Sequence, residues 1–286
     1  MHAERAKRLA ELRQLAADGH WLDVYRRTTL WEFPGDARLG FQLAFLVPFT
    51  VPDMAETLVD HGGIIRDPLR RGYHTGLIIH ELIAQGHDGE AGTRLVAHMN
   101  RLHHTADIPA EQMRFVLNGL IVLPTRFIQR AGWRPLDPVE LEATVRFYDR
   151  LGHLMGIPDR PCNYDEAAQQ FDQYAAAQIR PSREGALLGE ALLEVLRARF
   201  PRPLRRIAPR VFSAVIDPPA ASEALALPPT GRRTAAALNA ALGLRKTLIA
   251  RRPPPSKPSF TSGQPVGAIY PSGYDIEDIT GHGSML

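Results

Sequence analysis

Two adjacent histidines near the end of a predicted helix are the residues in this chain best suited to hold a metal. The helical periodicity of residues 90–108 places four side chains on one apolar stripe: Leu95, Val96, Met99 and Leu102. His103 falls on this stripe, whereas His104 lies about 100° further round, towards the polar side. A buried imidazole must be hydrogen-bonded or coordinated, because an unsatisfied polar group is costly. Periodicity allows a core histidine bonded to a carbonyl or water, which is the commoner case, or a metal or haem ligand.

A second polar group lies on the helix predicted over residues 70–85. Arg71 and Thr75 are four residues apart and therefore share one helix face, which Ile78, Ile79 and Leu82 continue. A guanidinium and a hydroxyl directed towards an apolar interior are unusual. The commoner interpretation is a helix N-terminus from which Arg71 reaches solvent. Arg126 follows Pro124 on another apolar helix, where a carbonyl freed by the proline could satisfy it.

Other sites of catalysis lack their signatures in this sequence. Neither H-E-x-x-H nor a pair of E-x-x-H motifs is present, so bare zinc and di-iron sites of those types are excluded. A hydrolase elbow of the G-x-S-x-G type and a glycine-rich phosphate loop are also missing. Four further histidines show no ligand-like spacing and are mostly predicted to be surface or packing residues: His74, His80, His87 and His98.

The composition indicates a soluble protein and argues against a nucleic-acid partner. Lys and Arg number 34 and Asp and Glu 31, and the basic residues are spread along the chain instead of clustering. The single Cys162 excludes an internal disulfide and fits a reducing cytoplasm, which is the location we expect. The N-terminal stretch lacks the apolar centre of a signal peptide, and the apolar runs are too short or too broken by proline to form a transmembrane segment.

The pattern of helix starts and stops predicts an all-α fold of about eight to eleven helices. Pro52, Asp137-Pro138 and Asn163 are typical helix-start residues, and helices are also predicted over 3–17, 36–47, 109–130, 182–199 and 232–250. Residues 19–35 are predicted to be a connecting stretch. We expect one globular domain over residues 1–250 and a tail over 251–286 that is rich in Pro, Gly and Ser and is irregular, partly docked or disordered.

The order of several short motifs resembles the MpaB and rubber-oxygenase (latex-clearing protein) family. The resemblance is clearest over residues 30–180. The motifs that carry it are FPGD at 33–36, FTVP at 49–52, R-x-x-x-T at 71–75, NRLH followed by Ile at 100–108, LPTR at 123–126, GWRPL at 132–136, GHLMGI at 152–157 and, in the tail, YPSGY at 270–274. Each motif is short, and their shared order and spacing are what make the resemblance specific.

The resemblance implies an all-α bundle that encloses a haem b pocket, with His103 as the axial iron ligand. His104 is the alternative ligand if the helix is rotated. Arg71 and Thr75 match the distal element of the family and would donate hydrogen bonds to dioxygen or to a haem propionate. Arg101 or Arg126 would pair with a propionate, since arginine offers two parallel donors to a carboxylate. Rubber oxygenases carry a lysine before the distal threonine, where this chain has His74, a candidate proton shuttle.

The function that this resemblance implies is oxygenation of a small apolar substrate by dioxygen or peroxide. An alkene-containing, isoprenoid-like molecule fits an apolar route lined by residues such as Ile78 and Leu82. The alternative is a non-catalytic helical protein of the same fold that binds haem or a lipid, because a fold does not by itself determine an activity.

Overall fold

The computed structural model describes residues 2–199, 205–206, 208–267 and 269–280. Over these residues it is helical throughout, with fourteen α-helices, one π-helix, one 3-10 helix and no β-strand. One isolated antiparallel bridge joins Val266 and Tyr270. The all-α prediction is confirmed, although the helices outnumber the eight to eleven expected, in part because several are only five to seven residues long.

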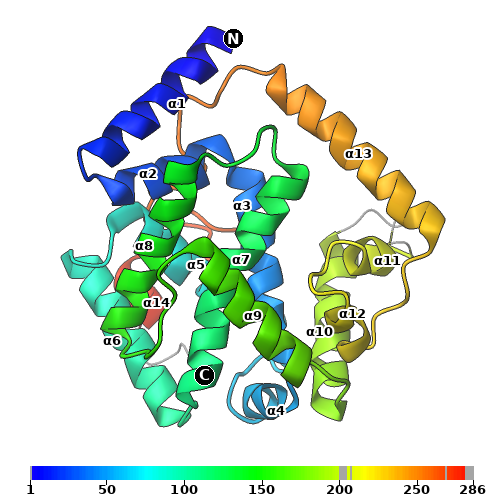
Figure 1. Ribbon diagram of the computed structural model, residues 1–286. Helices are drawn as coiled ribbons and strands as arrows, with labels where there is room; N and C mark the ends of the chain where they lie inside the picture. The colour runs from blue at the N-terminus through cyan, green and yellow to red at the C-terminus, as the bar shows by residue number, and fades with distance from the viewer. Residues whose placement is uncertain (1, 200–204, 207, 268, 281–286) are drawn as a thin grey trace.

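The helices follow one another along the chain as labelled in Figure 1: α1 His2–Ala17, α2 Trp21–Arg27, η1 Thr28–Glu32, α3 Pro34–Leu46, η2 Val47–Thr50, α4 Pro52–Asp60, α5 Pro68–Gln85, α6 Glu90–Thr105, α7 Ala110–Ala131, α8 Pro138–Leu154, α9 Tyr164–Gln178, α10 Arg183–Arg199, α11 Ala208–Ser213, α12 Ala220–Ala224, α13 Arg232–Ala250 and α14 Ile276–Thr280.

The prediction of a connecting stretch over residues 19–35 is wrong. This segment forms α2 and the π-helix η1, and several of its apolar side chains are buried: Val24, Tyr25, Leu30 and Phe33. Tyr25, for example, packs against Phe147 of α8 with ring centroids 4.5 Å apart. The order of the segment therefore comes from packing against a distant helix, which local periodicity does not report.

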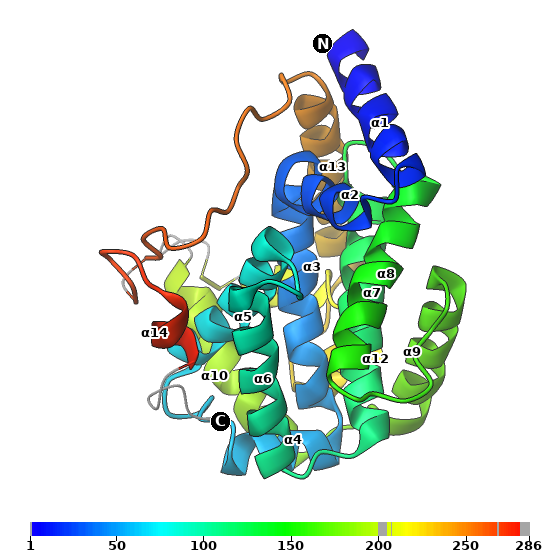
Figure 2. The same ribbon diagram turned by 90° about the vertical axis from the view of Figure 1, so that its left-hand side faces the viewer.

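Helices α3 and α7 form the centre of the molecule and pack closely against each other. Figure 2 shows α3 between the α5–α6 pair on one side and the α7–α8 pair on the other. The contact is close because Gly40 lies against Pro124, where an added Cβ atom would come within 2.3 Å of the Pro124 Cα atom. Helix α7 continues through Pro124 to Ala131. Together these helices supply much of the buried apolar core.

Helices α5 and α6 form an antiparallel hairpin that positions the predicted site. Asp67 caps α5 by accepting a hydrogen bond from the Arg70 backbone nitrogen at 3.0 Å. The helix ends at Gly86, whose φ of +83° suits glycine, and the chain turns tightly enough for Gly92 to approach the Gly86 carbonyl. The hairpin brings His103, near the end of α6, back beside the beginning of α5. The predicted stripe on α6 is buried at Leu95, Val96 and Met99.

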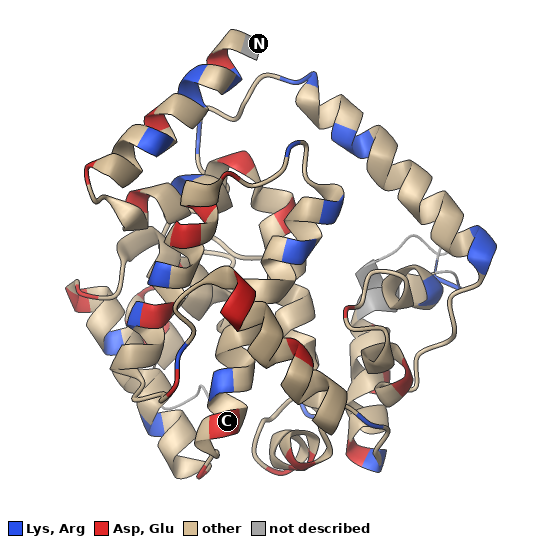
Figure 3. Ribbon diagram, viewed as in Figure 1, with Lys and Arg blue, Asp and Glu red and all other residues tan. Residues whose placement is uncertain are grey.

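The tail docks along the helical body over the residues that the structure describes. The Ser259 backbone nitrogen donates to the Leu30 carbonyl at 2.9 Å, and the Tyr274 hydroxyl donates to the buried carboxylate of Glu81. Residues 281–286 of the predicted tail lie outside the described residues. Figure 3 shows acidic and basic residues interspersed over most helices, whereas α13 carries basic residues and no acidic one. No described helix is both long and apolar enough to cross a membrane.

A candidate cofactor and substrate cavity

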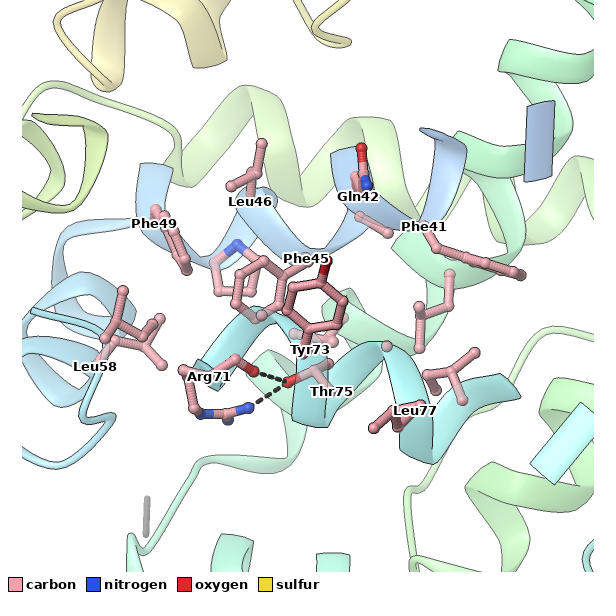
Figure 4. A pocket seen from close by; sticks show the side chains of 18 of the residues that line it. Phe41, Gln42, Phe45, Leu46, Phe49, Leu58, Arg71, Tyr73, Thr75 and Leu77 are labelled. Atoms are coloured by element: carbon pink, nitrogen blue, oxygen red, sulfur yellow. Dashed lines mark hydrogen bonds between the residues drawn. The ribbon is translucent and has the colours of Figure 1, made fainter. Parts of the chain in front are cut away.

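A cavity of about 510 Å³ lies between α3, α5, α6, α7, α10 and the tail. This volume falls within the range of known ligand pockets, roughly 300–1,000 Å³. Its lining is mostly apolar, with a few polar side chains that include Arg71, Thr75 and His103. Figure 4 shows Phe41, Phe45 and Phe49 on one wall, facing the segment of α5 that carries Arg71 and Thr75. An apolar chamber with a few convergent polar groups is typical of a binding or active site.

The Arg71 side chain is partly buried and has no carboxylate partner among the described residues. Its Nη1 atom donates a hydrogen bond to the Thr75 hydroxyl, which in turn donates to the Arg71 carbonyl at 3.3 Å. Its Nε atom is shielded from solvent and has no partner. Burial lowers the pKa of Arg71. Asp67 caps the helix, and the Arg71 guanidinium turns to Thr75 with its Nε atom shielded from solvent. A buried guanidinium of this kind calls for an anionic or oxygen-rich ligand.

His103 lines the same cavity in a form that can bind a metal. Its Nδ1 atom lies 2.7 Å from the Met99 carbonyl oxygen, so the N–H of the neutral ring sits on Nδ1 and Nε2 keeps its lone pair. Burial lowers the pKa of His103, although the bond to Met99 opposes the shift, and the charge of Arg71 adds to it. The ring is therefore neutral near pH 7. A backbone carbonyl that fixes the tautomer is a common second partner of a metal-bound histidine.

His80 on α5 is a second cavity histidine that the sequence predictions missed. Its Nδ1 atom lies 2.7 Å from the Gly76 carbonyl oxygen, which again leaves the lone pair on Nε2. Burial lowers its pKa as well. The ring packs edge-on against Phe41, with centroids 5.8 Å apart. A signal was present in the sequence, because His80 lies four residues, about one turn, beyond Gly76 on the same helix.

Four other predicted site residues lie outside the lining of this cavity. Arg101 and His104 are exposed on α6. His74 is buried beneath the tail, where its Nε2 atom lies 2.9 Å from the Tyr270 hydroxyl. Arg126 lines a second, smaller pocket, where its pairing with Asp172, at 2.6 Å, and with Asp217 raises its pKa against the effect of burial. The structure thus brings together three of the seven predicted residues: Arg71, Thr75 and His103.

The donor set of the cavity fits a haem better than a bare metal ion. No three His, Cys, Asp or Glu residues in the described part of the chain are placed to hold an ion together. His103 could supply one axial nitrogen, and a porphyrin brings the other four donors itself. The unpartnered Nε of Arg71 could serve a propionate, and the apolar walls suit the ring.

Comparison with known protein families assigns the chain to a class of oxygenases. Residues 31–247 match the family described as ER-bound oxygenase mpaB/B'/Rubber oxygenase, catalytic domain. The protein belongs to this family. The assignment confirms the resemblance in the sequence motifs and supports an oxidoreductase-type enzyme that uses a substrate and oxygen. A comparison with curated proteins found no match. The tail lies beyond the matched residues, yet Phe260 and Val266 contribute to the cavity wall.

Proposed function

We propose that this protein is a haem b-dependent oxygenase that acts on an apolar, alkene-containing substrate of isoprenoid type, with His103 as the iron ligand. The observation that carries the proposal is the meeting of two groups in one apolar cavity: the neutral His103 with its free Nε2, and the buried Arg71 without a counter-ion. The family assignment supports oxygenase chemistry. A cytoplasmic location is part of the proposal and rests on the sequence, chiefly the single Cys162.

The residues of the cavity have separate roles in this proposal. Haem, when bound, supplies the reaction with dioxygen or peroxide. His103 holds the cofactor from α6, and the Met99 carbonyl keeps the ring in the correct tautomer. Arg71 and Thr75 offer hydrogen bonds to an anionic or oxygen-rich group, either a propionate or the oxidant. The phenylalanines of α3 and η2 exclude water and surround the substrate.

Reconstitution with haem tests the proposal directly. We expect the purified protein to bind haem with a defined stoichiometry and to show a Soret band. His103→Ala should abolish or shift that band, since it removes the axial nitrogen. His80→Ala is the matched control, because His80 lines the same cavity with the same tautomer. A wild-type protein without a protein-bound Soret band after addition of haem would refute haem dependence. If the band is lost in the His80→Ala variant and kept in the His103→Ala variant, His80 is the ligand instead.

A second candidate function is non-catalytic binding of haem or a lipid, which the size and apolar lining of the cavity also favour. Haem binding is compatible with both functions, so turnover must separate them. Oxygen consumption by the haem-loaded protein with a reductant and a panel of alkenes is expected for the oxygenase. No uptake with any of them would favour the binding protein.

A further inference from the structure

Two groups of glycines within the described helices differ in what surrounds them. The first group permits close contact between segments of the chain. An added Cβ atom at Gly40, Gly92 or Gly189 would come within 2.3, 2.1 or 2.3 Å of a backbone atom of a neighbouring segment. Glycine is required at these positions because any side chain would overlap the neighbour.

Gly72 and Gly76 belong to the second group. They lie one turn apart in the interior of α5, and both line the cavity. An added Cβ atom at either position would meet no heavy atom of the described chain within 4 Å, the helix's own nearby backbone aside, and neither residue has a positive φ. Glycine inside a helix costs stability relative to alanine. Nothing in the described protein therefore accounts for two glycines on this face.

The surroundings of the two glycines have the shape of a slot. Gly72, Gly76 and His80 follow one another at intervals of four residues and span about 12 Å along the axis of α5. The two glycines thus leave a strip of bare α5 backbone about one helical turn long in the cavity wall, beside the side chains of Arg71, Thr75 and Ile79. Phe41, Phe45 and other apolar side chains form the opposite wall. Such a slot suits a flat ligand better than a branched one, because a flat ligand can touch both walls at once.

Arg71 provides independent evidence that a ligand occupies this space. The residue directly precedes Gly72, is partly buried and lines the same cavity. Its Nε atom has neither a protein partner nor access to solvent. A donor left in this state is satisfied when a ligand with an acceptor oxygen enters the slot. The bare backbone and the unpartnered donor therefore indicate the same ligand-filled space.

We propose that Gly72 and Gly76 form a ligand floor, a stretch of bare α5 backbone on which a flat, unsaturated hydrocarbon framework rests. Such a framework has two possible sources, the porphyrin of haem and the alkene of the substrate. For both sources the inference rests on the proposed function. His80 closes the floor at one end. Side chains at the two glycine positions would hold the ligand away from the helix without disturbing the protein itself.

Substitution of Gly76 by leucine tests the ligand floor. The matched control is Gly243→Leu, since Gly243 is also a helical glycine with no neighbour within 4 Å but lies on α13 outside the cavity. Both variants should melt at or above the wild-type temperature, because each replaces glycine in a helix. Haemin is titrated by absorbance and retinol, a flat polyene, by fluorescence. Gly76→Leu should weaken at least one of the two ligands about tenfold or more, and Gly243→Leu neither.

The two titrations separate the sources of the ligand and the two proposals. Weakening of haemin binding assigns the floor to the porphyrin, and weakening of retinol binding alone assigns it to the substrate. A folded Gly76→Leu variant with wild-type affinity for both ligands would overturn the ligand floor. A wild-type protein that binds retinol but no haemin would refute haem dependence, and the retinol titration would still decide on the floor. A wild-type protein that binds neither would overturn both.

Discussion

Two buried arginines show how differently two regions of this molecule are built. Arg134 belongs to a salt-bridge cluster with Glu32 and Glu140, in which its Nη2 atom donates to the Glu140 Oε1 atom at 2.8 Å and lies 3.8 Å from the Glu32 Oε2 atom. Burial alone would lower the pKa of Arg134, but the hydrogen bond and charge of Glu140 raise it. Arg71 in the cavity has only the Thr75 hydroxyl and an unpartnered Nε atom.

The glycines repeat the same contrast. Gly40 is in contact with Pro124, whereas Gly76 faces open space. The salt-bridge cluster and the α3–α7 contact are therefore complete within the protein chain. The cavity is complete only when a ligand is bound, because its buried donor and its bare backbone have no partners in the protein. Four substitutions or titrations can break or sharpen this comparison.

The largest effect is expected for Arg134→Leu. This change leaves the carboxylate of Glu140 buried without its cation and Glu32 with Arg8 alone. Breaking a buried pair in this way costs about 3–5 kcal/mol in the free energy of unfolding. Urea denaturation measures the loss. Arg27→Leu is the control, since both side chains of the Arg27–Glu11 pair are exposed and the pair should contribute no more than about 1 kcal/mol. Equal losses in the two variants would show that the buried cluster contributes no more to the free energy of unfolding than an exposed ion pair.

A smaller loss is expected for Gly40→Ala. The new methyl group would lie 2.3 Å from the Pro124 Cα atom, so α3 and α7 must move apart, at a cost of about 3 kcal/mol. The same substitution at Gly76 has open space and should leave the free energy of unfolding unchanged or increase it by up to about 1 kcal/mol. Thermal and urea denaturation of both variants measure the difference. A destabilised Gly76→Ala variant would show that the open face of α5 is packed in solution.

The pH dependence of stability is expected to depend on His87. Burial lowers the pKa of His87 to about 4. The charge of Asp88 opposes this shift and the charge of Arg150 adds to it. The ring packs against Phe147. Above pH 6.5 the ring is neutral in both the folded and unfolded states, so the contribution of the buried neutral ring to the free energy of unfolding is fully present. As the pH falls from 6.5 to about 4, His87 binds a proton in the unfolded chain but not in the folded chain. The free energy of unfolding therefore falls by roughly 2–3 kcal/mol.

The variant His87→Phe measures this contribution. Urea denaturation at several pH values should show a shallower decline than in the wild type, because phenylalanine keeps the packing and does not titrate. Part of the decline should remain, since burial also lowers the pKa values of His80 and His103. An unchanged slope would show that His87 is protonated in the folded protein.

The smallest effect, of opposite sign to the first, is expected for Arg71→Leu. Removing a buried cation without a counter-ion should raise the free energy of unfolding of the ligand-free protein by about 1 kcal/mol. Haem binding, followed by absorbance, should weaken in the same variant. A loss of stability comparable to that of Arg134→Leu would mean that Arg71 has a partner in solution and would remove the contrast between the two regions.

Parts of the fold and of the site could be predicted because their causes lie close together in the sequence. The capping box at Asp137 and Glu140 and the cap at Asn163 start α8 and α9 as expected. The stripe of Leu95, Val96 and Met99 correctly placed one face of α6 inside. Helical periodicity singled out Arg71, Thr75 and His103, the family motifs assigned roles to them, and the structure brings them to one cavity.

Other features could not be predicted because distant segments cause them. Trp21–Arg27 is helical owing to its contact with α8, and His80 faces the cavity because α3 and the tail form the opposite wall. The burial of Tyr274 against Glu81 joins residues 193 positions apart.

The sequence by itself determined most of the longer helices, many of their ends and the residue types able to hold an iron or an oxygen atom. Only the tertiary structure decided which of those residues share a space, and which buried groups are left without partners. Helical periodicity is a property of neighbours along the chain. Whether Arg71 has a counter-ion, or Gly76 open space, depends on the surfaces that face them from other helices.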